Sequence, residues 1–190
     1  MLLFREKIPT TWLPKVLVNL PAVLVDHAHL ERKAATSALN LEKFRDLFPR
    51  VDDLNAIAIE ELQHFQLVLN LLKKRDIPFG QAYPSAWISG LMRAVRNGAR
   101  HQVIDHLICC SLIEGRSCEK FQVLAQALVS RDPELAAFYQ GLVESEGNHY
   151  ATYLLMAKEI DEPETHRRLD YYLQLDAELI RVPNPLPLLH

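Results

Sequence analysis

The sequence is poor in cysteine and has no long apolar run, and each shortage excludes a class of protein. Its 190 residues include three cysteines, Cys109, Cys110 and Cys118, which form no C-x-x-C motif. An odd cysteine count without a secretion signal favours a reducing compartment, so we expect a cytoplasmic protein whose thiols pack between helices and bind no metal. No apolar stretch approaches the roughly 18 residues that a membrane-spanning helix needs. We therefore expect no membrane partner.

An excess of one charge is also missing. The formal net charge is −3, from 21 Lys and Arg against 24 Asp and Glu, so the total does not indicate a nucleic-acid-binding protein, although a local patch could still bind one. The opening MLLFREKIPTTWLP carries charges and prolines where a signal peptide keeps an uninterrupted apolar stretch. An apolar fraction of 49% is ordinary for a globular protein, and we expect one domain over residues 1–190.

Helical periodicity runs along most of the chain, and no strand pattern competes with it. After an irregular lead-in over residues 1–20, we expect four long helices. Asp52 and Asp53 are expected to cap the second, and Asp132-Pro133 to open the fourth. The long connection over 76–97 contains a short helix. We predict an all-α, ferritin-like four-helix bundle with a long crossover between helices 2 and 3 and additional short helices. The expected helices span 21–47, 52–75, 85–97, 98–130, 133–159 and 163–180.

Two Glu-x-x-His motifs stand far apart, and each follows a lone glutamate at nearly the same distance. Residues three apart on a helix share a face, so a Glu and a His at this spacing can bind one metal ion. Four carboxylates and two imidazoles suit a pair of iron or manganese ions in the core of a helical bundle. The candidate ligands are Glu31, Glu61 and His64 in the first set and Glu114, Glu146 and His149 in the second.

All six candidate ligands interrupt an otherwise apolar helix face, where unpaired glutamates are rare. The alternative is a bundle with a few hydrogen-bonded polar residues in its core, which is the usual explanation for a single such residue. Six in a duplicated register favour the metal site. Glu60 and Glu144 fall on other faces, and we expect both to be solvated. His27 and Tyr153 lie one turn from candidate ligands and either line a pocket or pack in the core.

The pattern Glu31, Glu61-x-x-His64, Glu114, Glu146-x-x-His149 resembles that of the ferritin-like non-haem di-iron carboxylate proteins. Within them, the segments DHAHLERKAA, EELQHF, IEGRSCEKF and ESEGNHY resemble the MiaE family of tRNA hydroxylases, over nearly the whole chain. The resemblance implies two iron ions, O2 as co-substrate and electrons from an external reductase. It also implies hydroxylation of the isopentenyl group of 2-methylthio-N6-isopentenyladenosine in the tRNA anticodon stem-loop, with no catalytic residue beyond the metal ligands.

Contacts to RNA are less clearly indicated. Arg93, Arg96 and Arg100 are spaced three and four apart, and we expect them to form a basic face that binds phosphate. The alternative is that these arginines are simply solvated or stabilise a helix end.

Two other functions remain open on the residues alone. The chain could be a ferritin-like iron-binding or peroxide-handling protein without a nucleic-acid substrate, or a metal-free helical interaction protein. Tightly bound iron separates the last from the others. Salt-sensitive binding to a modified anticodon stem-loop separates the hydroxylase from the iron-handling protein.

Overall fold

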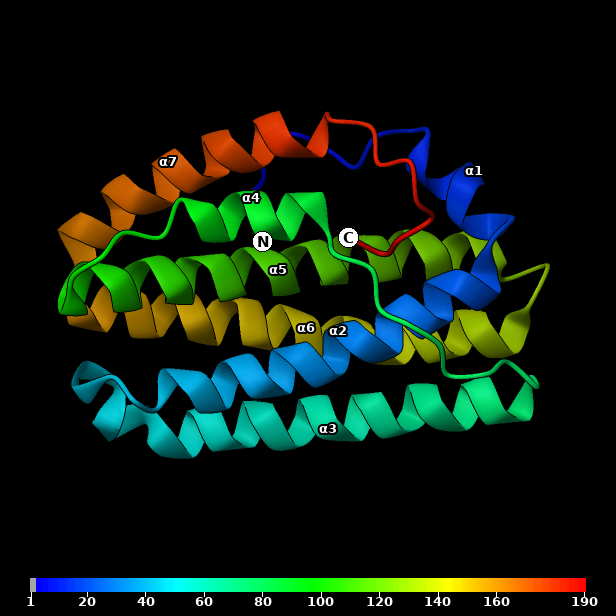
Figure 1. Ribbon diagram of the computed structural model, residues 1–190, viewed down its shortest axis with the longest axis horizontal. Helices are drawn as coiled ribbons and strands as arrows, with labels where there is room; N and C mark the ends of the chain where they lie inside the picture. The colour runs from blue at the N-terminus through cyan, green and yellow to red at the C-terminus, as the bar shows by residue number, and fades with distance from the viewer. Residues whose placement is uncertain (1–2) are drawn as a thin grey trace.

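Four long helices run alongside one another in the computed structural model, which describes residues 3–190 (Figure 1). They form two pairs, because α2 packs mainly against α3 and α5 mainly against α6. No strand occurs between residues 3 and 190. The predicted all-α, ferritin-like four-helix bundle is confirmed. The long helices are α2 (Leu20–Leu41), α3 (Val51–Lys74), α5 (Ala99–Leu128) and α6 (Pro133–Ile160).

The remaining helices are shorter and lie outside the four-helix core. The crossover from α3 to α5 contains α4 (Ala86–Arg93), which packs against α5 and α7 (Glu162–Ile180). Both lie on the side of α5 away from α3 (Figure 1). Gly90 allows α4 to approach α7 closely, because a Cβ there would lie 2.6 Å from the Leu179 side chain. The crossover thus adds a partial outer layer over α5.

Two boundaries near the N-terminus differ from the prediction. The first long helix ends at Leu41 instead of continuing to 47, because Phe44 is extended (φ −84°, ψ 123°) and Arg45–Arg50 form a 3-10 helix. The lead-in predicted as irregular contains α1 (Trp12–Leu17). Pro14 lies in its first turn, where a missing N–H costs nothing.

The predicted caps are confirmed for α6 but not for α3. Asp132 accepts a hydrogen bond from the Leu135 N–H, and Pro133 follows it at the first helical position. For α3 the cap position is Arg50, while Asp52 and Asp53 lie in the first turn. Carboxylates there favour the positive end of the helix dipole without closing a cap hydrogen bond.

The buried apolar core is divided along the bundle into two clusters. One contains Leu54, Leu107 and Met156, and the other contains Leu24, Leu72 and Phe121. In the sequence of each of the four long helices, the predicted ligands lie between residues of one cluster and residues of the other. Ionised groups in such a position are costly unless they are paired or bind a cation.

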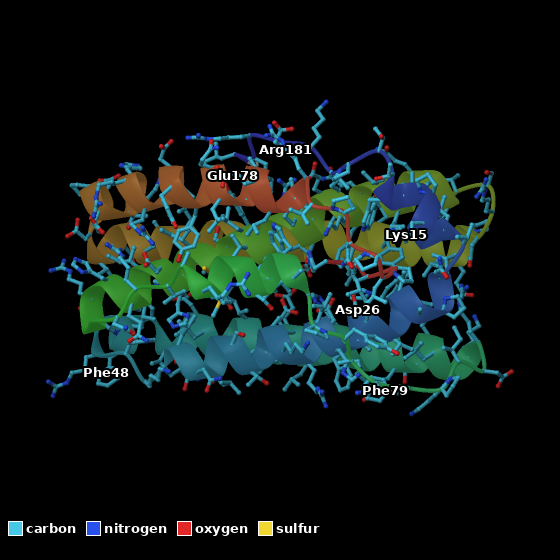
Figure 2. The ribbon with its side chains drawn as sticks, turned by 45° about the horizontal axis from the view of Figure 1, so that its top comes forward. Lys15, Asp26, Phe48, Phe79, Glu178 and Arg181 are labelled. Atoms are coloured by element: carbon cyan, nitrogen blue, oxygen red, sulfur yellow. The ribbon has the colours of Figure 1, made fainter. Side chains whose placement is uncertain are left out.

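The segment after α7 folds back into the bundle. Leu188, Leu189 and His190 are almost fully buried. The Leu189 N–H donates to Asp26 Oδ2 (2.8 Å), where the segment meets α2 (Figure 2). The Trp12 indole donates to the Leu188 carbonyl (3.2 Å). Leu189 and His190 also line the cavity described below.

None of the helices in the described chain is both long and apolar enough to cross a membrane.

Candidate metal centre

All four long helices contribute to one buried polar cluster. The structure brings the six predicted ligands together there, and none is more than 6% exposed. α2 and α5 each supply one glutamate, and α3 and α6 each supply a Glu-x-x-His pair, whose members share a face because they are three residues apart. The predicted ligands are Glu31 from α2, Glu61 and His64 from α3, Glu114 from α5, and Glu146 and His149 from α6.

The cluster resolves into two overlapping groups of four residues. Within each, one potential ligand atom per residue lies within 4.8 Å of all the others. Glu61 and Glu146 belong to both groups and are therefore placed to bridge two ions. Glu31 and Glu114 each belong to one. The first group is Glu31, Glu61, His64 and Glu146, and the second is Glu61, Glu114, Glu146 and His149.

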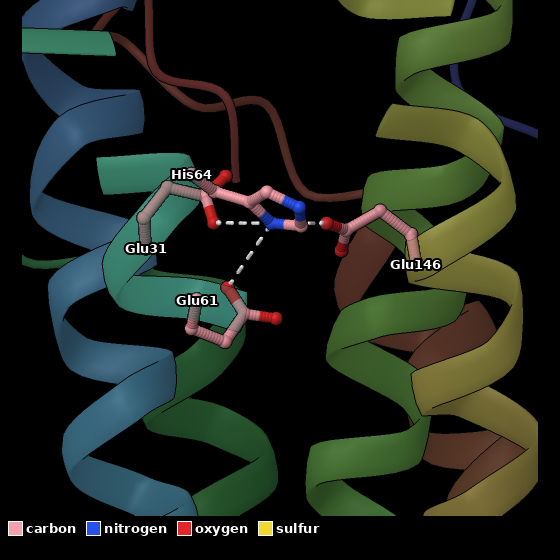
Figure 3. A group of neighbouring side chains, drawn as sticks. All are labelled: Glu31, Glu61, His64 and Glu146. Carbon is pink, nitrogen blue, oxygen red and sulfur yellow. Dashed lines mark ion pairs between the residues drawn. The ribbon is translucent and has the colours of Figure 1, made fainter. Parts of the chain in front are cut away.

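Both imidazoles direct Nδ1 into the cluster. His64 Nδ1 lies 3.5 Å from Glu31 Oε2, 3.8 Å from Glu61 Oε2 and 3.6 Å from Glu146 Oε1, as drawn in Figure 3. His149 Nδ1 lies 2.7 Å from Glu61 Oε1. Around His64, one carboxylate oxygen from each of the three glutamates and the Nδ1 atom of the ring thus face a common point.

The inward atoms fit a metal better than they fit one another. Both Glu61 oxygens, Glu146 Oε1 and the Nδ1 atoms of His64 and His149 are buried and make no hydrogen bond. Buried polar atoms without partners are uncommon and indicate an ion or another missing partner. Oxygen and imidazole donors suit iron, manganese or zinc, and two divalent cations would neutralise four carboxylates.

The pKa values of the cluster reflect the crowding of its charges. Burial, reinforced by the charge of Glu61, raises the pKa of Glu114 to about 8. Burial alone would lower the pKa of His64, but the carboxylates of Glu31 and Glu61 raise it to about 10. In the same way, Glu61 outweighs burial and raises the pKa of His149 to about 9. The pKa of Glu31 shifts in the opposite direction to that of Glu114. Contact with His27 and His64 outweighs burial and lowers the Glu31 pKa.

Two residues missed by the sequence reasoning contact the outer nitrogens of the imidazoles. His149 Nε2 lies 2.9 Å from Glu60 Oε2, and His64 Nε2 lies 3.4 Å from Ser145 Oγ. Such partners fix the orientation of a metal-binding imidazole. The prediction that Glu60 is solvated is therefore only half right, because its side chain is 45% exposed yet contacts His149. The available signal was position, since each residue immediately precedes a motif glutamate.

A cavity of about 800 Å³ leads from the surface to the cluster. It lies between α2, α4, α5 and the segment that ends the described chain. Glu31, Glu61, Glu114 and Glu146 line it, whereas His64 and His149 do not. A substrate would therefore approach on the carboxylate side of the centre. The two imidazoles and their outer partners lie on the other side.

His27 lines this cavity, as one of the two predicted alternatives states. It is fully buried, contacts Glu31 and stacks against Tyr139 at 5.6 Å between ring centroids. Tyr153 is also fully buried but is not part of the cavity wall. Core packing accounts for Tyr153.

The structure does not present the three predicted RNA-binding arginines as one free basic face. Arg93 is exposed. Arg96 donates to Asp105 (2.8 Å) and Glu164 (2.6 Å), and Arg100 donates to the Ile160 carbonyl. Arg96 thus joins the crossover to α5 and α7. Its substitution would break these contacts as well as remove a charge.

The three cysteines lie on α5, and none belongs to the cluster. Cys109 and Cys118 are buried, and burial raises the pKa of Cys109 to about 12. A thiol so reluctant to ionise is a poor metal ligand, in agreement with the packing role predicted for these residues.

Comparison with known proteins identifies relatives that share this architecture. The family model described as tRNA-(MS[2]IO[6]A)-hydroxylase (MiaE) matches residues 2–190. A Pseudomonas putida protein named tRNA 2-(methylsulfanyl)-N(6)-isopentenyladenosine(37) hydroxylase is 35% identical over 178 residues, which cover 93% of this chain and 85% of that protein. A Salmonella typhimurium protein of the same name is 37% identical over 134 residues, which cover 70% of this chain and 48% of that protein.

A solved structure shares the fold over the full length. It is Protein 43 with aldehyde deformylating oxygenase activity from Synechococcus, with a TM-score of 0.92 and 27% identity, covering 100% of this chain and 96% of its own. The family match extends over nearly every residue that builds the bundle and the cluster. This chain therefore belongs to the MiaE family of tRNA hydroxylases.

Proposed function

We propose that this protein is an O2-dependent di-iron monooxygenase that hydroxylates the isopentenyl group of 2-methylthio-N6-isopentenyladenosine next to the tRNA anticodon. The observation that carries the proposal is the cavity of about 800 Å³ that ends on four carboxylates of a two-group ligand cluster. The family match and the names of the two relatives support the substrate.

Six residues of this chain would hold the two irons, which supply the O2 activation that no protein side chain can provide. Glu61 and Glu146 would bridge the ions, while the other four ligands would each bind one. The four-helix core keeps bulk water from the imidazole side. The balanced reaction places one oxygen atom of O2 in a C–H bond and releases the other as water. It consumes two protons and two electrons, and we propose an external reductase as the electron source.

The chain's own residues would orient the substrate. A cavity walled by Ile88, Met92 and Ile113 offers apolar contact to an isopentenyl group, and its floor lies at Glu31 and Glu114. Holding the reacting carbon close to the ions contributes more to rate than binding alone, because a poorly aimed substrate reacts slowly.

The Synechococcus structure supports a second candidate, an aldehyde deformylating oxygenase. An apolar chain could enter the same cavity. The outer lining of the cavity opposes this function, because Thr36, Ser37, Asn40 and two lysines are poor partners for an alkyl chain. An iron-storage function would leave a cavity of this size without a use.

Mass analysis of modified tRNA tests the proposal. The iron-loaded protein, supplied with O2 and a chemical reductant, should add one oxygen atom to the isopentenyl adenosine. tRNA that lacks the isopentenyl group serves as the control and should remain unchanged. Turnover of an aldehyde without any change in the tRNA would favour the second candidate. Iron uptake with neither reaction would favour the iron-handling protein.

A further inference from the structure

The rim of the cavity carries charge of one sign. Its floor holds the four carboxylates of the metal centre, and the remaining described lining contains no acidic side chain. The rim has three cationic side chains, from Arg32, Lys33 and Lys43, and all three residues are exposed. Arg32 contacts His29 (3.2 Å), whereas Lys33 and Lys43 form no ion pair within the described chain. Two free ammonium groups thus flank the entrance.

Aromatic groups lie beside these cations. The Phe44 and His106 rings are 6.0 Å apart between centroids and inclined at 41°, and both residues are partly exposed in the cavity wall. Lys43 Nζ lies 5.1 Å from the centre of the Phe44 ring. Unpaired RNA bases are commonly held by stacking on aromatic or imidazole rings beside basic side chains.

Hydrogen-bonding groups complete the rim. Ser37 and Asn40 lie three residues apart on the exposed face of α2, and Thr36 is their neighbour. Lys33 is four residues before Ser37 and therefore lies on the same face. One helix face thus combines a cation with hydroxyl and amide groups, which can contact phosphate, ribose and base edges.

We propose, on the basis of the proposed function, that this rim binds the single-stranded anticodon loop. The modified adenine stacks against Phe44 and His106, and Lys33 and Lys43 contact the flanking phosphates. The isopentenyl group then points down the cavity toward Glu31 and Glu114. The RNA surface is formed by α2 and the Phe44 turn, not by Arg93, Arg96 and Arg100. A duplex does not fit, because a base must leave its stack to enter the cavity.

The test compares two charge-matched double variants of the full-length, iron-loaded protein. Lys33→Gln with Lys43→Gln removes the two rim cations. Lys73→Gln with Arg131→Gln removes two exposed cations at the opposite end of the bundle, near the α3 and α5 C-termini (Figure 1). The probe is a synthetic anticodon stem-loop that carries the isopentenyl adenosine, titrated over a range of salt concentrations.

The rim variant should bind the stem-loop roughly tenfold more weakly, and its slope of log affinity against log salt should fall by about 1.4, or about 0.7 for each lost contact to single-stranded phosphate. The control variant should match the parent. Hydroxylation of the free isopentenylated nucleoside, which has no phosphate, should fall far less in the rim variant than hydroxylation of the stem-loop. Phe44→Leu should instead weaken the binding of both the stem-loop and the nucleoside, because each presents the same base.

The outcomes separate this surface from the underlying function. If the parent hydroxylates the stem-loop and the rim variant keeps its affinity and salt slope, the RNA surface lies elsewhere while the function stands. If the parent neither binds nor hydroxylates the stem-loop, the proposed function fails and the RNA surface fails with it. Iron content and thermal unfolding equal to those of the parent show that the exposed lysine substitutions leave the fold intact.

Discussion

Glu60 and Ser145 make the two halves of the metal centre chemically unequal. His149 is held by a carboxylate at 2.9 Å and His64 by a hydroxyl at 3.4 Å. A carboxylate partner raises the basicity of an imidazole more strongly than a neutral hydroxyl does. The ion bound by His149 should therefore be held more tightly than the one bound by His64.

Glu60→Gln should lower the affinity for the ion at His149 by about 10–100-fold and leave the affinity for the ion at His64 largely unaffected. Ser145→Ala should have a smaller effect, confined to the His64 ion. Stepwise iron titration, followed by the spectroscopic signature of each ion, measures both. Equal loss of both ions in the two variants would contradict this inequality.

The ligand assignment itself makes a residue-level prediction. Purified protein should carry up to two irons per chain, and Glu114→Ala and His149→Ala should each lower that content sharply. The helices should remain formed, because most apolar contacts lie in the two flanking clusters. Metal analysis and circular dichroism measure the two properties.

Glu144→Ala is the matched control for these ligand variants. Glu144 is exposed and lies two residues from Glu146 on the same helix. Its loss should leave the iron content unchanged. Full iron content in both Glu114→Ala and His149→Ala would refute the ligand assignment.

Residue-level sequence reasoning predicted six candidate ligands, which the structure brings into one cluster, but it missed the outer partners of the two histidines. A glutamate on an apolar helix face can be recognised from periodicity within its own helix. Glu60 sits beside that face, and its contact with His149 depends on how α3 and α6 meet. The single sequence does not contain that angle, so the position of Glu60 next to Glu61 was a signal, but its contact with His149 could not be predicted.

At the scale of the elements, Asp105 connects three segments that are distant in sequence. It lies on α5, is fully buried, and accepts hydrogen bonds from Arg96 in the crossover and Arg168 on α7. Burial alone would raise its pKa, but the two guanidinium groups lower that pKa below the usual 3.8. The network holds the outer layer against the bundle.

Asp105→Asn should destabilise the protein by about 3–5 kcal/mol, because it leaves the buried Arg168 guanidinium without its counter-charge, whereas Arg96 keeps its ion pair with Glu164. Asp105 has a lowered folded-state pKa, so its contribution is present above about pH 3.8 and is lost as the pH falls through the folded pKa. The difference in the free energy of unfolding between the parent and the variant should therefore shrink as the pH falls. Chemical denaturation at neutral and acidic pH measures it.

Asp170→Asn is the control for this substitution. It removes an exposed carboxylate that pairs with Arg5, and its side chain is 74% exposed. The loss should be under about 1 kcal/mol. A similar loss in both variants would mean that the Asp105 network contributes no more than a surface pair.

Helix boundaries were predicted well where the apolar helical periodicity continued without a break. They were predicted poorly where tertiary contacts ended or began a helix. The long helices α3, α5 and α6 begin and end within about two residues of their expected limits. The α2 end was misplaced because the extended Phe44 is set by its packing against the core and His106. Helix α1 was missed because Pro14 was taken as a breaker, although it lies in the first turn.

At the scale of the whole molecule, metal binding should contribute to stability. The carboxylates lie between the two apolar clusters along the long helices, and their mutual repulsion opposes folding. A ligand that binds only the folded state stabilises it by about 2.7 kcal/mol at a concentration 100 times its dissociation constant. Iron should therefore do more than enable catalysis.

Removal of iron by a chelator should lower the thermal midpoint by roughly 5–10 °C, given about 2–4 °C per kcal/mol for a chain of this size. Adding iron back should restore it. Differential scanning calorimetry checks this, with the Glu114→Ala variant as a control that should respond less. An identical midpoint with and without iron would show that the folded cluster needs no cation.

The candidate metal centre joins the N-terminal half of the chain, which contains α2 and α3, to the C-terminal half, which contains α5 and α6. Each half supplies three residues to one four-residue group and one glutamate, Glu61 or Glu146, to the other group, so each proposed ion would have ligands from both halves. Each half also supplies the outer partner of the opposite histidine. Neither half therefore encodes a complete mononuclear site, and expressing the halves separately would restore metal binding only if they reassociate. A substitution at Glu60 or Ser145 should likewise affect the histidine supplied by the other half of the chain.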